Sequence, residues 1–148
     1  MKKDLVPTAT INIGRGELSI GENVIKLSPI EFCYYRYFAE RVISGKGDER
    51  FSGFVVSLDF MEKIYKYHEE SFEFLDTNRI ELKNMIKKKE ELGIQTFRGN
   101  ISKANKKIRE TLNNDTLSDY FTISIDGGRG AKFYGIKADK EKFSLVNK

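Results

Sequence analysis

Basic and hydrogen-bonding side chains recur at short intervals between residues 98 and 109. They are Arg98, Asn100, Ser102, Lys103, Lys106, Lys107 and Arg109. Ammonium and guanidinium groups contact phosphate, and Arg or Asn can also form paired hydrogen bonds with the edges of bases. The chemistry that this segment offers is therefore contact with a polyanion.

A helix is needed to present these side chains on one side. Apolar residues follow one another in steps of three and four, which is the spacing of one buried helical stripe. These residues are Phe97, Ile101, Ala104, Ile108 and Leu112. The pattern predicts a helix over 95–113 that packs on one side and carries Lys103, Lys106 and Glu110 on the other.

The net positive charge of the chain is concentrated in the same region. The formal charge is +4, and residues 96–137 carry eight Lys or Arg against four Asp or Glu. Residues 1–95 carry fifteen against sixteen. A local cationic excess attracts polyanions, but a solvated lysine-rich face gives the same counts. Charge alone does not decide between these interpretations.

Composition indicates one globular domain. The chain has 148 residues, of which 39% are hydrophobic and 32% are charged. The longest apolar runs are too short for a transmembrane helix, and the first residues lack the apolar run of a signal peptide. Cys33 is the single cysteine, which excludes an internal disulfide and fits a reducing compartment. We therefore expect a cytoplasmic protein with no membrane partner.

The first third of the chain predicts a β-meander followed by a core helix. Apolar and polar residues alternate in three short segments within 8–27, with Gly and Asn at the turns. Ser28, Pro29 and Glu31 then form a helix start with a capping box. The helix runs on through an aromatic segment, and Cys33 within it is expected to be a buried apolar residue.

A long middle segment, 45–92, is expected to be an insertion in the helical core. It holds a polar loop, a short extended piece, a helix that begins at Ser57 or Asp59, and a mostly helical stretch over 72–92. His68 is the single histidine. Because a metal site needs several converging ligands, we interpret His68 as a surface or helix-end residue.

The last part of the chain predicts a hairpin with a glycine-rich tip. Residues 120–125 and 131–136 alternate as strands do, and residues 126–130 join them. No helix follows the glycines, so the phosphate-binding loop of a nucleotide site is not indicated. Arg129 and Lys132 complete the candidate site on this hairpin. The tail after residue 137 is expected to fray, apart from Phe143 and Leu145.

In this order, the elements resemble a winged helix-turn-helix domain of the OmpR/PhoB response-regulator type. Residues 24–32, Val-Ile-Lys-Leu-Ser-Pro-Ile-Glu-Phe, resemble the family's entry to its first helix. Residues 101–108, Ile-Ser-Lys-Ala-Asn-Lys-Lys-Ile, resemble its recognition helix, and residues 120–136 resemble its closing strand and wing. The sequence departs from the family at Ala104 and Asn105, where Leu and Arg are usual.

The resemblance implies an α+β winged helix-turn-helix fold in one domain, 1–148. Its parts are an amino-terminal β-meander at 8–27, a helical core at 28–113, a carboxyl-terminal wing hairpin at 120–137 and a tail at 138–148. It also implies that the basic helix contacts the major groove of double-stranded DNA, that the wing contacts backbone or minor groove, and that the protein is regulatory. The lysine-rich face predicts weak sequence preference and steep salt dependence. No cofactor is implied.

Two alternatives remain beside DNA binding. Residues 24–40 are also similar to the winged-helix part that some CRISPR-associated proteins carry after a nucleotide-sensing domain. The chain would then be a regulatory or protein-interaction module of such an effector, and its basic helix would face a protein partner or a second copy. An enzyme is the other alternative, but no nucleophile–His–acid arrangement or metal-ligand cluster supports it, so no catalytic residue is assigned.

Overall fold

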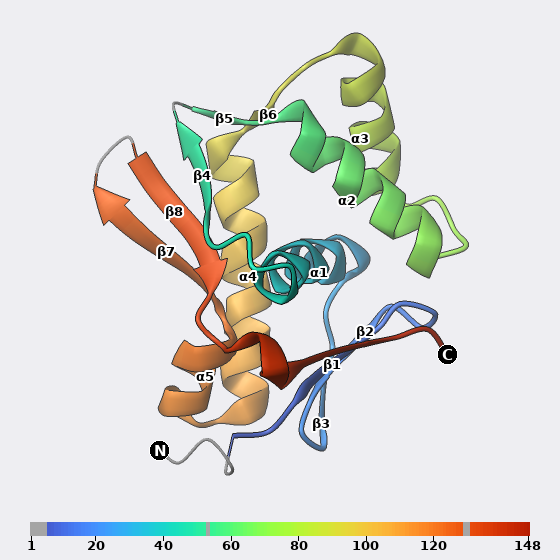
Figure 1. Ribbon diagram of the computed structural model, residues 1–148. Helices are drawn as coiled ribbons and strands as arrows, with labels where there is room; N and C mark the ends of the chain where they lie inside the picture. The colour runs from blue at the N-terminus through green and yellow to red at the C-terminus, as the bar shows by residue number, and fades with distance from the viewer. Residues whose placement is uncertain (1–5, 53, 129–130) are drawn as a thin grey trace.

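The computed structural model describes residues 6–52, 54–128 and 131–148, and it is an α+β structure (Figure 1). Within this part, no helix combines the length and the apolar character that are needed to cross a membrane. The helices of the described residues are α1 (Pro29–Ile43), α2 (Leu58–Ser71), α3 (Thr77–Lys88), α4 (Ile94–Leu112), α5 (Asp115–Phe121) and the 3-10 helix η2 (Lys140–Lys142).

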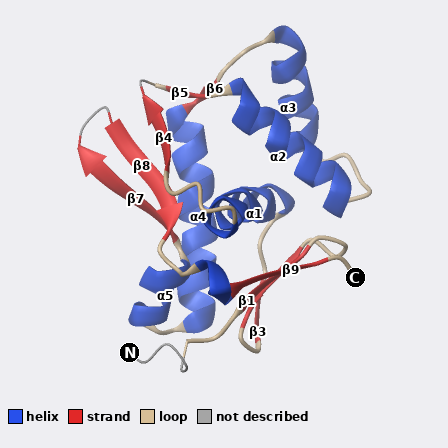
Figure 2. Cartoon of the chain, viewed as in Figure 1, coloured by secondary structure: helices blue, strands red, loops and turns tan. Residues whose placement is uncertain are grey.

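The strands of the described residues form three small sheets around the helices (Figure 2). One has the order β3-β2-β1-β9, the second has the order β4-β8-β7, and β5 pairs with β6. The pairs are antiparallel except β1 with β9, which is parallel. The bounds are β1 (Ala9–Asn12), β2 (Glu17–Ile20), β3 (Asn23–Ile25), β4 (Glu49–Ser52), β5 (Val55–Val56), β6 (Leu92–Gly93), β7 (Ile123–Gly128), β8 (Ala131–Ile136) and β9 (Phe143–Val146).

Helix α1 lies at the centre of the core, where residues 30–39 are all buried. The predicted capping box is confirmed, because Ser28 Oγ accepts the Glu31 amide at 3.4 Å and Glu31 Oε1 accepts the Ser28 amide at 2.9 Å. Cys33 is buried as expected, and burial raises the pKa of its thiol. The thiol therefore stays neutral and acts as a small apolar core residue.

Aromatic rings join α1 to the elements around it. The ring of Phe97 in α4 lies 5.6 Å from Tyr34 of α1, 5.2 Å from Phe60 of α2 and 4.9 Å from Tyr134 of β8, measured between centroids. Contacts of this kind add to the stabilisation that comes from burial alone. Phe60 shows that the segment 45–92 contributes side chains to the same core as the helices on either side of it.

Helix α4 follows the apolar pattern that predicted it. It spans Ile94–Leu112 and packs against α1 and β3. Asn113 ends it in the left-handed conformation, at φ 47°. The stripe residues Phe97, Ile101, Ala104 and Ile108 are buried, and Leu112 is half-buried. One side of α4 is thus fixed in the core and the other faces water.

The carboxyl-terminal tail does not fray, which corrects the expectation for residues 138–148. Strand β9 pairs in parallel with β1, and Phe143 is buried. Lys142 Nζ also donates a hydrogen bond to Val6 O at 2.9 Å. The reason is that β1 pairs with β2 along only one edge, so the tail can pair with the backbone groups of the other edge.

Two predicted element boundaries are also wrong. The strand expected from residue 120 begins at Ile123, because the Asn114 side chain accepts the Leu117 amide at 3.1 Å and caps α5. The helical stretch expected over 72–92 begins only at residue 77, because the Asp76 carboxylate accepts the Arg79 amide at 2.8 Å and caps α3. In both places a local side-chain cap decides where the helix starts.

His68 lies in the last turn of α2, as one of the two expected alternatives has it, but it is fully buried and is not a surface residue. Its Nε2 lies 3.1 Å from Asp76 Oδ2, and its Nδ1 lies 3.3 Å from Arg79 Nη1. Arg79 Nη1 also donates to Phe72 O at 3.1 Å. The imidazole therefore links the end of α2 to the beginning of α3.

Candidate nucleic-acid interface

The water-facing side of α4 carries a line of residues on successive turns, which we call the outer stripe. It consists of Gln95, Gly99, Ser102, Lys103 and Lys106, of which Gly99 is half-buried and the others are exposed. Their spacing of three and four residues places them together, opposite the buried stripe. Three of the nine expected site residues, Ser102, Lys103 and Lys106, lie on it.

Lys103 and Lys106 are the cations of the outer stripe. Within the described residues, Lys103 forms no ion pair or side-chain hydrogen bond, and Lys106 Nζ lies 3.9 Å from Glu110 Oε1. The side chains of Lys106 and Glu110 are 77% and 65% exposed. Because an exposed pair of this kind contributes little, both ammonium groups are available to an external anion.

One flank of α4 faces α1. Two of the expected site residues, Lys107 and Asn100, contact α1 there. Lys107 Nζ lies 2.6 Å from Glu31 Oε1, and the Glu31 side chain is 4% exposed. Asn100 Nδ2 donates to Tyr34 Oη at 3.2 Å. Burial raises the pKa of Tyr34 to about 12, so its hydroxyl stays protonated. Lys107 compensates a buried carboxylate, and its charge is therefore committed to the fold.

The opposite flank of α4 faces the hairpin and holds Asn105 and one more of the expected site residues, Arg98. Asn105 Nδ2 donates to Ile123 O, and Asn105 Oδ1 accepts the Ile123 amide, each at 2.9 Å. Arg98 Nε donates to Tyr134 Oη at 2.9 Å. Asn and Arg are the residue types that read bases best. Here, both position the hairpin against α4.

Acidic side chains lie beside this flank. Arg109 Nη2 lies 2.9 Å from Asp119 Oδ1, and the two side chains are 46% and 68% exposed. Together with Asp126 and Lys137, they line an open hollow of about 330 Å³ between α4 and β7. The Arg109 pair can open at little cost, but the two carboxylates repel phosphate. They would oppose any anion that approached this side of α4.

The hairpin presents less of the expected site than its sequence indicated. Arg129 lies outside the described residues. Lys132 is half-buried, and its Nζ donates to Gly127 O at 3.1 Å across the hairpin. Asp126, on the neighbouring strand, is exposed. A contact between the hairpin and phosphate stays a prediction.

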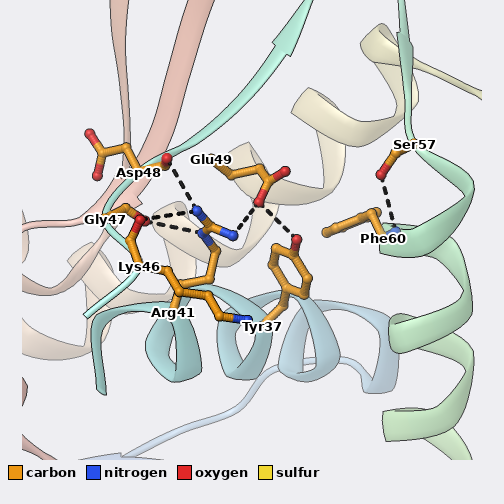
Figure 3. A network of polar contacts seen from close by, with 8 residues as sticks. All are labelled: Tyr37, Arg41, Lys46, Gly47, Asp48, Glu49, Ser57 and Phe60. Atoms are coloured by element: carbon orange, nitrogen blue, oxygen red, sulfur yellow. Dashed lines mark hydrogen bonds and ion pairs between the residues drawn. The ribbon is translucent and has the colours of Figure 1, made fainter. Parts of the chain in front are cut away.

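A second hollow, of about 480 Å³, is lined by residues of α1, β4 and α2. Figure 3 shows the polar contacts that three of its lining residues, Tyr37, Arg41 and Glu49, make. Arg41 donates to the carbonyl groups of residues 46–48 and pairs with Glu49, which also accepts the Tyr37 hydroxyl at 3.0 Å. Burial and the adjacent Glu49 carboxylate raise the pKa of Tyr37. The network fixes the loop before β4, and none of these residues is a nucleophile activated by a neighbouring base.

Metal binding has no support in the described part of the chain. There, no three or more His, Cys, Asp or Glu side chains come together as a metal site requires.

Two outer-stripe residues, Gln95 and Gly99, were not assigned from the sequence. The signal that could have found them is their spacing of four residues from each other and from Lys103.

Comparisons of the chain with protein-family models, with curated proteins and with solved structures each give no match.

Proposed function

We propose that this chain is a winged helix-turn-helix protein that binds double-stranded DNA through the outer stripe of α4. The order of the elements supports the fold: a β-meander, then the helices from α1 to α4, then the hairpin of β7 and β8. The connection between α3 and α4 is short and ends in Gly93, as is common in helix-turn-helix pairs. Helix α4 takes the place of the recognition helix.

The observation that carries the proposal is the availability of Lys103 and Lys106 on a helix whose other side is buried. A recognition helix contacts the major groove with one exposed side while the rest of the domain holds it in place. Helix α4 meets this requirement, because its flanks are held by α1 and by the hairpin. Its outer stripe is the side that remains for a ligand.

The charges predict weak binding that depends on salt. Lys103, Lys106 and Arg109 would neutralise about three phosphates, which corresponds to a slope of about −3 for log affinity against log salt. Asp119 and Asp126 oppose them. We therefore expect measurable binding at low salt and a loss of most of it near physiological salt.

The test is the binding of a labelled random duplex across a salt series. We compare the wild-type protein with Lys103→Glu/Lys106→Glu and with a matched control, Lys87→Glu/Lys88→Glu on the exposed end of α3. Both double variants change the net charge equally. The outer-stripe variant should lose affinity and reduce the steepness of the slope by about two, whereas the control should change both only slightly.

Two results would overturn the proposal. One is the absence of wild-type binding even at low salt. The other is an equal loss of affinity in the control variant, which would show that binding follows the overall charge rather than α4.

Protein binding is a second candidate function, and a different surface favours it. Phe74, Leu75 and Ile80 are 56%, 57% and 46% exposed, and they lie in the α2–α3 connection and the first turns of α3. Clustered exposed apolar side chains are typical of protein interfaces. This surface would serve a protein partner or a second copy of the chain without involving the outer stripe.

A further inference from the structure

Gly99 is a glycine that the fold does not require. It lies inside α4, where glycine is less favourable than alanine, and its φ is not in the positive region that favours glycine. Apart from its two chain neighbours and the backbone of its own helix, a Cβ atom built at this position meets no atom of the described residues within 4 Å. Neither the backbone nor the packing of the chain explains the absence of a side chain.

The position of Gly99 on the outer stripe supplies an explanation. It lies four residues after Gln95 and four before Lys103, so it is the midpoint of the exposed line. A glycine leaves the helix backbone uncovered and allows a partner to approach it closely. Since Lys103 lies one turn after Gly99 and Lys106 about one turn further, a partner that carries phosphate fits this side of α4 best.

Gln95, one turn before Gly99, is the side chain placed to read bases. The amide of Gln can bond adenine N6 and N7 together in the major groove. Other residues of that kind on α4 are engaged within the chain: Arg98 on Tyr134, Asn100 on Tyr34, and Asn105 on Ile123. Arg109 pairs with Asp119 and lies in the last turn of α4, far from the first turn. Gln95 is exposed in the first turn of α4, the part of a recognition helix that contacts base edges.

We infer that α4 enters the major groove with Gly99 as the point of closest approach, and that Gln95 determines what base preference the protein has. The inference rests on the proposed DNA binding. It adds a steric role for Gly99, a base-reading role for Gln95 and the identity of the preferred base. The preferred base is adenine, at a position covered by the first turn of α4. Lys103 and Lys106 then contact the phosphates that border the groove.

The steric part is tested with Gly99→Ala and Gly99→Leu. Ala and Leu are both good helix formers, so each should raise the melting temperature, but they differ in bulk. Duplex affinity should fall roughly fivefold for Ala and further for Leu, because the added atoms hold the helix out of the groove. Thr111→Ala and Thr111→Leu, exposed on the same helix away from the outer stripe, should leave the affinity unchanged.

The base-reading part is tested by selecting duplexes from a random pool with the wild type and with Gln95→Ala. The wild type should enrich adenine at one position, by roughly tenfold over the other bases, and Gln95→Ala should lose that enrichment. The affinity of Gln95→Ala for unselected DNA should stay close to that of the wild type, since the phosphate contacts are intact.

The outcomes separate this inference from the proposed function. If the wild type binds no duplex, both are wrong. If the wild type binds and Gly99→Leu binds equally well, the close approach at Gly99 is wrong and the proposed function stands. If Gln95→Ala selects the same sequences as the wild type, the assignment of base reading to Gln95 is wrong.

Discussion

Asn105 is of a residue type that can bind the edges of bases, but its side chain makes a structural contact within the protein. Its amide bonds both the N–H and the C=O of Ile123, the first residue of β7. These bonds fix the point at which the chain leaves α5 and enters the hairpin.

Asn105→Ala should lower the free energy of unfolding by about 1–3 kcal/mol, because it leaves both backbone groups of Ile123 without their partners. Urea unfolding measures this change, with Thr111→Ala as the control for an exposed site on α4. The affinity of the folded variant for duplex DNA should stay within about twofold of the wild type, since the Asn105 amide is engaged on Ile123 and supplies no contact to phosphate. A stable variant with an altered base preference would contradict the structural role.

The sequence was informative about single residues where the contact is local. Ser28 and Glu31 are three residues apart, so their capping box could be predicted from spacing alone. Lys107 and Glu31 are 76 residues apart, and nothing in the local pattern indicates that they meet. For this reason the expected site included Lys107 as a DNA contact, whereas the structure gives it a buried partner.

At the scale of elements, α2 and α3 are joined by a polar contact at their connection. The carboxylate of Asp76 caps α3 and lies beside His68 at the end of α2. Partial burial of Asp76 acts to raise its pKa, but the hydrogen bond from the Arg79 amide and the neighbouring His68 outweigh burial and hold the pKa below its usual range. The charged form of Asp76 is therefore stabilised by the folded state.

Asp76→Asn should destabilise the protein at pH 7 by about 1 kcal/mol, because Asn keeps the helix cap but removes the charge beside His68 and Arg79. A carboxyl group whose pKa is lowered on folding stabilises the fold above its unfolded pKa, and this contribution is lost as the pH falls through the folded pKa. The difference between variant and wild type should therefore shrink as the pH falls below about 4.

Thermal unfolding of both proteins between pH 7 and pH 2.5 measures this difference. His68→Gln serves as a companion variant, since it removes the imidazole while Asp76 stays. A stability difference that is constant over this pH range would show that the Asp76 charge has no favourable partner in the fold.

Elements with a regular pattern were predictable, and those that depend on distant pairing were not. Helix α4 and strand β8 agree with the pattern to within one residue, because their buried sides impose a clear period. Helix α5 was not predicted, and only its last two residues fell within the strand expected over 120–125, since its seven residues are too few to show a helical period. Strand β9 forms because β1 offers it an edge, and the tail's own sequence does not reveal that edge.

At the scale of the whole molecule, contacts between distant segments hold α4 in one orientation. Strand β8 connects β4 to β7, and β9 returns beside β1, so the hairpin and the tail are tied to sheets that flank α1 (Figure 1). The outer stripe belongs to a helix that is supported along its length. We therefore expect DNA to bind without a large rearrangement of the backbone.

The measurement that tests the central claim most directly is a titration of ¹⁵N-labelled protein with a short duplex at low salt, followed by amide chemical shifts. Our account predicts progressive shifts at Gln95, Gly99, Ser102, Lys103 and Lys106, and none at Phe74, Leu75 or Ile80. Shifts confined to that apolar surface, or no shifts at the outer stripe, would contradict it.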